Sequence, residues 1–163
     1  MIAPRVELVP VDEDVLEELV CVAVDDADPD EVTPPLEPGR GPARVGWLRD
    51  FHRRCRSGLT GGDQLTGAVR VDGRVSGSIR LERLPTGDLE YGLWLARAAR
   101  GRGLSHLVLD LVAQRAVEAG AHRILGRKTA DNGPAVATLR RAGAVIEIGP
   151  GTEVSAIIDL ARG

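Results

Sequence analysis

The stretch Arg100-Gly101-Arg102-Gly103-Leu104-Ser105 decides the fold of this chain. It lies between a short apolar segment, residues 89–95, and a segment with helical periodicity that begins near Leu104. The order is therefore strand, glycine-rich turn and helix, and such a turn exposes backbone N–H groups where the helix dipole is positive. Arg100 and Arg102 add donors for charge-assisted hydrogen bonds to phosphate oxygens. The stretch therefore predicts a binding site for a phosphorylated ligand.

Apolar periodicity outside this turn predicts the other elements. A helix follows Asp12, a candidate N-cap, a second covers residues 43–55, and a short one begins at Pro134. Segments 25–42 and 57–63 are rich in Asp, Pro or Gly and are expected to be loops, the first with room for one short turn. The expected strands cover residues 5–11, 65–71, 75–84, 89–95, 123–129, 145–148 and 154–160.

This order predicts an α/β (α+β) fold with a mixed sheet. Asp72-Gly73 is a tight-turn signal, so the two strands beside it should pair antiparallel. The glycine turn joins strand 89–95 to a helix that leads to strand 123–129, so these two strands should lie parallel. The length of 163 residues and the hydrophobic fraction of 43% suit a single domain over residues 1–163.

Composition excludes several classes of protein. No apolar run approaches the roughly 18 residues that a membrane helix needs, and residues 1–10 lack the apolar stretch of a signal peptide. Cys21 and Cys55 lack metal-ligand spacing and are expected to be reduced, buried side chains. We therefore expect a cytoplasmic protein that binds no metal, no membrane and no nucleic acid.

Charge is spread unevenly along the chain. Residues 1–40 carry twelve acidic and two basic side chains, whereas the rest carries twelve acidic and nineteen basic ones. The basic part holds the expected phosphate turn. The acidic part predicts either a surface for a cationic partner or a solvated acidic helix and loop, and the sequence leaves both open.

Three families of phosphate-binding turn are candidates for this stretch. A P-loop needs G-x-x-x-x-G-K-S/T, and no such string exists. A dinucleotide fingerprint needs G-x-G-x-x-G, but His106 stands where the third glycine should be. The stretch resembles the acyl-CoA signature of the GNAT superfamily of N-acetyltransferases, Q/R-x-x-G-x-G/A, with Ser105 at the last position. The hydroxyl of Ser105 is also a candidate cap for the helix.

Two further segments carry the same resemblance. Residues 89–95, LEYGLWL, resemble the central strand of the family in its E-x-G-x-x-L/V form. That form is typical of the branch that acetylates ribosomal-protein N-termini and of its antibiotic-acetylating relatives. Asn132 with residues 139–144, LRRAGA, resembles the family's late Asn and helix segment. The resemblance covers about residues 5–160. It implies a sheet of about six to seven strands, splayed in the middle and flanked by about four helices.

The resemblance also implies the cosubstrate, acetyl-CoA. Backbone N–H groups of the glycine turn would hold the pyrophosphate, and Arg100 would help to close the turn. The strand backbone near Leu95 would pair with pantetheine, and a backbone N–H there would polarise the thioester carbonyl. Asn132 would bond the pantetheine arm, although a turn residue before a helix is the alternative. The expected cofactor-binding residues are Leu93, Leu95, Arg100, Gly101, Arg102, Gly103, Leu104, Ser105 and Asn132.

Catalysis requires a neutral amine and a proton for the leaving thiolate. The resemblance implies that Glu90 is the general base, and a salt bridge to Arg80 or Arg83 is the alternative. The tyrosine that usually protonates the thiolate is replaced by Leu139, and the serine that some relatives use is replaced by Ala135. Water would then supply that proton, or catalysis is weak.

The acceptor is expected to be a primary amine. The first helices wall the acceptor site in this superfamily, so Asp28 and Glu31 would bind it and Trp94 would form an apolar wall. The negative charge of Asp28 and Glu31 favours a cationic acceptor: an aminoglycoside-like amine, a polyamine or a protein N-terminus. Antibiotic resistance is then one role to expect. A non-catalytic acyl-CoA-binding domain and a nucleotide-binding module are the alternatives. Homodimers are common among relatives.

Overall fold

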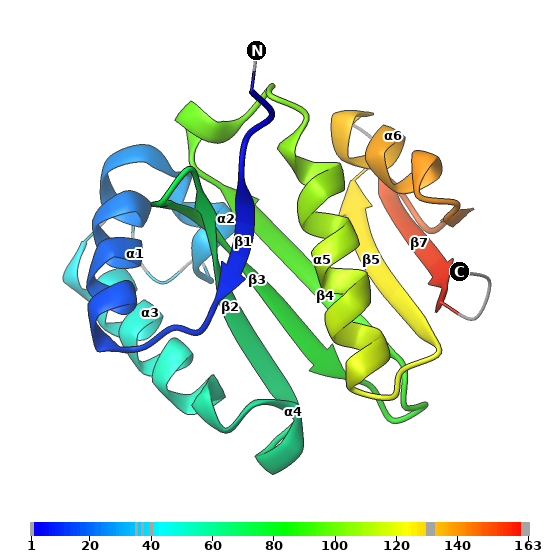
Figure 1. Ribbon diagram of the computed structural model, residues 1–163, viewed down its shortest axis with the longest axis horizontal. Coiled ribbons are helices and arrows are strands. Elements are labelled where there is room, and N and C mark those ends of the chain that lie inside the picture. The colour runs from blue at the N-terminus through cyan, green and yellow to red at the C-terminus, as the bar shows by residue number, and fades with distance from the viewer. Residues whose placement is uncertain (1, 35, 37, 40, 130–132, 161–163) are drawn as a thin grey trace.

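The chain folds around one seven-stranded sheet in the order β1-β2-β3-β4-β5-β7-β6 (Figure 1). The computed structural model describes residues 2–34, 36, 38–39, 41–129 and 133–160. The β4–β5 pair is parallel and the β2–β3 hairpin antiparallel, as expected, and the remaining neighbouring pairs are antiparallel as well. The strands are β1 (Val6–Val9), β2 (Gln64–Val71), β3 (Arg74–Arg83), β4 (Leu89–Leu95), β5 (Arg123–Thr129), β6 (Val145–Ile148) and β7 (Glu153–Asp159).

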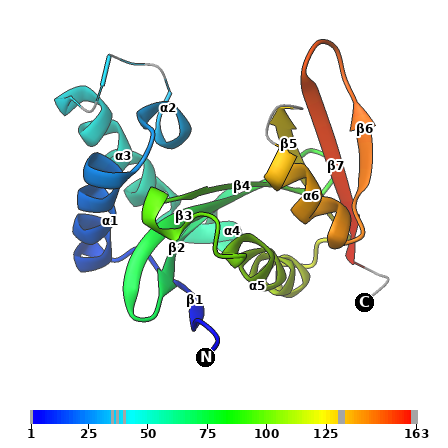
Figure 2. The same ribbon diagram turned by 90° about the horizontal axis from the view of Figure 1, so that it is seen from above.

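Helices cover both faces of this sheet (Figure 2). One apolar core joins α1 and α3 to one face of β2–β4, and a second joins α5 and α6 to the other face. Asp12 caps α1 as predicted, because its Oδ1 accepts a hydrogen bond of 2.8 Å from the Val15 backbone N–H. The helices are α1 (Glu13–Asp26), α2 (Pro29–Val32), α3 (Pro42–Arg54), α4 (Gly58–Gly61), α5 (Leu104–Glu118) and α6 (Gly133–Arg141).

The sheet opens in its middle, between β4 and β5. β4 pairs with β3 along its whole length, from Leu89 to Leu95. Its pairing with β5 ends at Tyr91, which lies opposite Gly126. Beyond Tyr91 one edge of β4 therefore pairs with no strand in the part of the chain that the structure describes, which confirms the expected splay.

Some local expectations were wrong. Segment 57–63 is not a plain loop, because a 3₁₀ turn (Cys55–Ser57) and the one-turn helix α4 occupy most of it. β1 ends at Val9 rather than at residue 11, and the next residue, Pro10, has no N–H for a sheet ladder. Cys21 is exposed rather than buried, whereas Cys55 is buried, and burial raises the pKa of its thiol. No helix in the described part of the chain has the length and apolar character needed to cross a membrane.

Candidate functional site

The glycine turn leaves the start of α5 without a side-chain cap. Gly101 and Gly103 have φ values of 71° and 69°, in the left-handed region that favours glycine. Gly103 is the N-cap of α5, and no side chain of the described residues bonds the first N–H groups of the helix. The expectation that Ser105 caps the helix was therefore wrong, because Ser105 lies one residue inside it, after Leu104. An oxyanion placed before these N–H groups would meet the positive end of the helix dipole.

Arg100 ties the turn to the end of β4. Its Nε donates a hydrogen bond of 3.1 Å to the backbone carbonyl of Leu95. Its terminal nitrogen forms an ion pair with Glu31 of α2. Arg102, on the other side of the turn, lies 3.8 Å from a carboxylate oxygen of Asp72. The turn is thus held between β4, α2 and the β2–β3 hairpin.

The acidic residues 25–31 are largely engaged within the chain. Asp26 accepts a hydrogen bond of 2.9 Å from the Ala98 backbone N–H, just before the glycine turn. Asp28 caps α2 by accepting from the Asp30 N–H at 3.0 Å, and Asp30 pairs with the buried Arg44 at 2.8 Å. These carboxylates therefore brace the fold around the turn and are not simply solvated.

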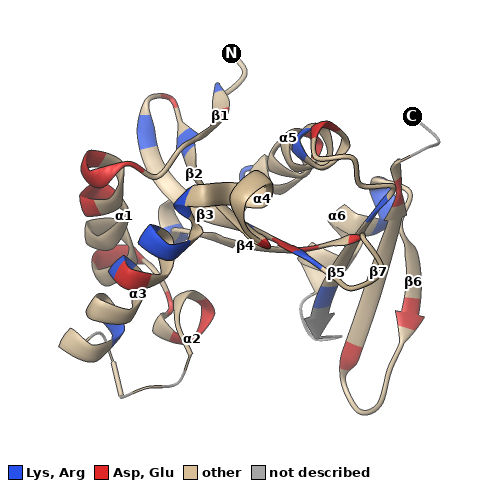
Figure 3. Cartoon of the chain, turned by 90° about the horizontal axis from the view of Figure 1, so that it is seen from below, with Lys and Arg blue, Asp and Glu red and all other residues tan. Residues whose placement is uncertain are grey.

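Two acidic residues of α1, Glu13 and Glu17, are paired with arginines in the same way. Figure 3 shows acidic residues along α1 and basic residues on the neighbouring α3. Glu17 pairs with Arg49 at 2.9 Å, and Glu13 pairs with Arg53 at 3.1 Å and with Arg56 at 2.6 Å. The two arginines lower the pKa of Glu13 to about 2. The acidic first helix therefore offers less free negative charge than its sequence suggests.

Glu90 lies in a cluster of charges on β3, β4 and β5. Its side chain is 17% exposed and lies 3.5 Å from Arg80 and 3.3 Å from Arg127. The ion pair with Arg80, expected as the alternative to a catalytic role for Glu90, is present, whereas Arg83 instead bonds backbone carbonyls. Glu82, opposite Glu90 on β3, also pairs with Arg80. The two arginines hold the Glu90 carboxylate beside the point where β4 and β5 separate.

A cavity of about 640 Å³ lies between α2, α3, β3 and β4. Two of the expected acceptor residues, Glu31 and Trp94, line it, while Asp28 is not among its lining residues. Trp94 is 8% exposed and also packs in the core beneath α1 and α3. Gly92 and Leu93 line the cavity as well, and both lie beyond the end of the β4–β5 pairing. The cavity therefore meets β4 where its edge is free.

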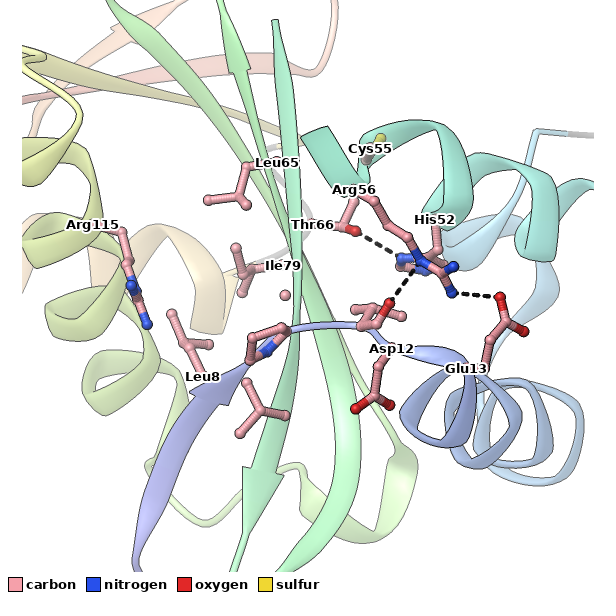
Figure 4. Close-up of a pocket in the computed structure, with 14 residues that line it drawn as sticks. Leu8, Asp12, Glu13, His52, Cys55, Arg56, Leu65, Thr66, Ile79 and Arg115 are labelled. Atoms are coloured by element: carbon pink, nitrogen blue, oxygen red, sulfur yellow. Dashed lines mark hydrogen bonds and ion pairs between the residues drawn. The ribbon is translucent and has the colours of Figure 1, made fainter. Parts of the chain in front are cut away.

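A second cavity, of about 520 Å³, lies beside the end of β1 (Figure 4). Apolar side chains such as Leu8, Leu65 and Ile79 form much of its lining. Arg56, at one side of this cavity, donates a hydrogen bond of 3.2 Å from its Nε to the Val11 carbonyl. None of its lining residues belongs to β4 or to the glycine turn. It is therefore separate from the turn and from the splayed strand edge.

His52 lines both cavities and is 1% exposed. Its Nδ1 shares a hydrogen bond of 2.9 Å with the Thr66 hydroxyl. Burial lowers the pKa of His52 to about 4. The imidazole is thus neutral at pH 7. No pattern of neighbouring catalytic residues marks His52 in the sequence.

Folding stability should therefore depend on pH through His52. The unfolded chain binds a proton at this residue near pH 6.5 and the folded chain only near pH 4, so the free energy of unfolding should fall as pH drops between these values. The expected loss is about 3 kcal/mol. Urea unfolding from pH 7 to 4 measures it. In His52→Gln this part of the slope should disappear, and an unchanged slope would contradict the assignment.

Two glycines that the sequence did not single out shape the site. A Cβ at Gly77 of β3 would lie 2.2 Å from the Trp94 backbone oxygen. A Cβ at Gly126 of β5 would lie 3.2 Å from the Tyr91 ring and 3.9 Å from Leu139. Both glycines therefore allow close packing at the splay, Gly77 against the β4 backbone and Gly126 against a side chain.

A buried leucine occupies the position where the family resemblance expects a tyrosine as proton donor. Leu139, at the position usual for a tyrosine, is fully buried in the core. Tyr91, the one tyrosine of the chain, lies at the end of the β4–β5 pairing, and burial raises its pKa to about 12. The expected pantetheine contact, Asn132, falls outside the described residues. The described residues contain no group of three or more side chains suited to hold a metal ion.

Solved structures of acetyltransferases share this fold. RimJ of Mycobacterium smegmatis, in complex with CoA-disulfide, has a TM-score of 0.80 at 19% identity over 96% of this chain and 83% of that one. The GNAT domain of S. lividans PAT has a TM-score of 0.72 at 20% identity over 96% and 90%. Campylobacter jejuni N-acetyltransferase PseH, in complex with acetyl coenzyme A, has 0.68 at 10% over 96% and 99%. At these identities the likeness establishes the fold.

The family follows from the sequence comparison. Curated protein sequences gave no match to this chain. The family model described as "Acetyltransferase (GNAT) domain" matches residues 5–145, which is most of the chain and includes the glycine turn and the splayed strand. The chain therefore belongs to the GNAT acetyltransferase family.

Proposed function

We propose that the protein is an acetyl-CoA-dependent N-acetyltransferase that transfers the acetyl group directly to a primary amine in a ternary complex. One observation carries the proposal: the uncapped start of α5 lies behind two left-handed glycines, beside the free edge of β4. The first feature suits a pyrophosphate and the second suits an extended amide chain such as pantetheine. Family membership and the CoA and acetyl-CoA complexes of similar structures support it.

The residues of the turn fit the diphosphate of CoA. Gly101 has no atom within 4 Å of a Cβ position, so a phosphate can approach its backbone closely. The N–H groups of Arg102, Gly103 and Ser105 would bind the phosphate oxygens, with Arg100 and Arg102 adding positive charge. The backbone at Leu93 and Leu95 would pair with pantetheine along the free edge of β4.

The reaction requires one bond to form and one to break. The amine nitrogen attacks the thioester carbonyl, the C–N bond forms, and the C–S bond breaks to release the CoA thiolate. We assign Glu90 to take the proton that the amine loses, directly or through water, with Arg80 and Arg127 positioning its carboxylate. Solvent water protonates the thiolate, which is tolerable because thiols ionise near pH 8.5.

The acceptor is a primary amine, and the acidic residues before the glycine turn offer little free negative charge to a cationic one. Asp26, Asp28, Asp30 and Glu31 all have partners within the chain.

A direct test measures CoA thiol release from acetyl-CoA with a panel of primary amines, and mass spectrometry of the acetylated product. A gain of 42 Da on an amine, matched by free thiol, is the expected result. The second candidate is an acyl-CoA-binding domain without catalysis, favoured by Leu139 and Ala135 at the positions of the usual acid. Tight binding of acetyl-CoA without turnover on any amine would select that candidate.

A further inference from the structure

The chain is poor in aromatic residues, and most of those it has are gathered in one place. Its full set is two Trp, one Tyr and one Phe. Trp47, Phe51 and Trp94 all line the 640 Å³ cavity beside β4. The Trp47 and Phe51 rings stack, with centroids 4.8 Å apart and planes 11° apart. Since the cores are otherwise built mainly from aliphatic side chains, this concentration suits a ligand with a flat apolar part.

The aromatic pair shares its helix face with a cation. Trp47, Phe51 and Arg54 stand at positions i, i+4 and i+7 of α3, so they follow one stripe of the helix. All three line the cavity. The stripe is about 10 Å long from Trp47 to Arg54, which is the size of a small ringed molecule with a charged group at one end.

Arg54 is the charged residue of this cavity that has no ion pair with another described residue. The other charged lining residues are Glu31, which pairs with Arg100, and Arg80, which pairs with two glutamates. Among the described residues, none forms a hydrogen bond or ion pair with the exposed Arg54 guanidinium. An unmatched guanidinium repels a polycation and attracts a carboxylate or phosphate, to which it can donate two parallel hydrogen bonds.

The opposite wall of the cavity is the stretch of β4 from Gly92 to Trp94, beyond the end of the β4–β5 pairing. In the proposed function the thioester lies along this strand. A ligand whose ring lies against α3 would therefore reach toward β4 with its remaining substituent, which is where a reacting amine is needed.

We propose that the acceptor is a primary amine that also carries a planar aromatic ring and an anionic group, with the ring against Trp47 and Phe51 and the anion on Arg54. This inference rests on the proposed function for the identity of the reacting group. It replaces the polyamine-like acceptor that the acidic N-terminal region suggested. The anion is a carboxylate or a phosphate, which Arg54 binds in the same way.

Four acceptors separate these features. Phenylalanine carries ring, amine and carboxylate, O-phosphotyramine carries a phosphate instead, phenethylamine lacks the anion, and spermidine is a polycation without a ring. The wild-type protein should acetylate one or both of the anionic acceptors with kcat/KM at least tenfold above phenethylamine and spermidine. The better of the two identifies the anion. Preference for spermidine would overturn the proposal.

Variants on α3 test the assigned contacts. Arg54→Gln should lower kcat/KM for the anionic acceptors about tenfold and leave phenethylamine unchanged. Phe51→Leu should lower kcat/KM for all three acceptors that carry a ring. Arg49→Gln is the control, because it removes the same charge from the same helix. Arg49 pairs with Glu17 outside the cavity, so this variant should leave kcat/KM unchanged for all four acceptors. An equal effect of Arg54→Gln on phenethylamine would overturn the assignment of Arg54.

Calorimetry of the same acceptors on the CoA-saturated protein separates this inference from the proposed function. If no amine is acetylated but the anionic ringed ligands bind and Arg54→Gln weakens them, the ligand class stands and the transferase activity fails. If acetylation occurs but the ring and the anion make no difference, the activity stands and this inference fails. If these ligands neither react nor bind, the inference fails as well.

Discussion

Replacement of Glu90 by glutamine is expected to lower kcat about 100-fold or more, with little change in the KM for acetyl-CoA. The reason is chemical, because the amide keeps the size of the side chain and its hydrogen-bond acceptor but cannot take a proton from the amine. The arginine pair around Glu90 should hold the glutamine in place, so the fold should be retained. Steady-state kinetics across a range of pH measures the effect.

Glu82→Gln is the matched control for this variant. Glu82 lies opposite Glu90 in the β3–β4 register and pairs with the same Arg80. The Glu82→Gln substitution therefore removes an equal charge from the same cluster and leaves the proposed base in place. An equal loss of kcat in both variants, or a pH–rate profile that does not change in Glu90→Gln, would show that the cluster acts through structure alone.

Gly77→Ala should have the largest effect on the fold at the site. The new methyl group would lie 2.2 Å from the Trp94 backbone oxygen and 3.1 Å from Leu95 Cα, so the β4 backbone itself must move. The expected cost is about 3 kcal/mol of unfolding free energy, at the upper end for overpacking. Because the displaced residues lie at the free edge of β4, affinity for acetyl-CoA should fall as well.

Gly67→Ala provides the comparison for this change. Gly67 also lies in an interior strand. A Cβ added at Gly67 would lie 3.5 Å from the nearest atom, a side-chain carbon of Ile79, which is an ordinary contact. Urea unfolding should show a much smaller loss for this variant, and acetyl-CoA binding should be unaltered. A Gly77→Ala protein as stable as wild type would mean that β3 and β4 do not approach so closely.

Features set by nearby residues could be predicted from the sequence. The Asp12 cap and the Asp72-Gly73 turn, with φ values of 49° and 83°, depend only on neighbouring positions. The two glycines of the turn and the parallel crossover followed from the order strand, turn and helix. The splay itself entered through the resemblance to the family, which the match over residues 5–145 confirms.

Features set by distant partners could not be predicted. Glu31 and Arg100 are 69 positions apart in the chain. The sequence therefore predicted an acidic loop and a basic turn, but not the ion pair between them. The role of Gly77 depends on the register of β3 against β4. Likewise, Trp47 and Phe51 are visible as a helical pair, but only the fold brings them to the same cavity as Trp94.

The central claim is that the glycine turn binds acetyl-CoA, and isothermal titration calorimetry tests it most directly. Gly103→Val forces a β-branched residue into a left-handed backbone at the start of α5, whereas Gly120→Val imposes similar strain just beyond its end, where φ is 78°. Wild type and Gly120→Val should bind acetyl-CoA alike, and Gly103→Val at least tenfold more weakly. Equal binding by Gly103→Val, or tighter binding of ATP or NAD than of acetyl-CoA by wild type, would contradict the account.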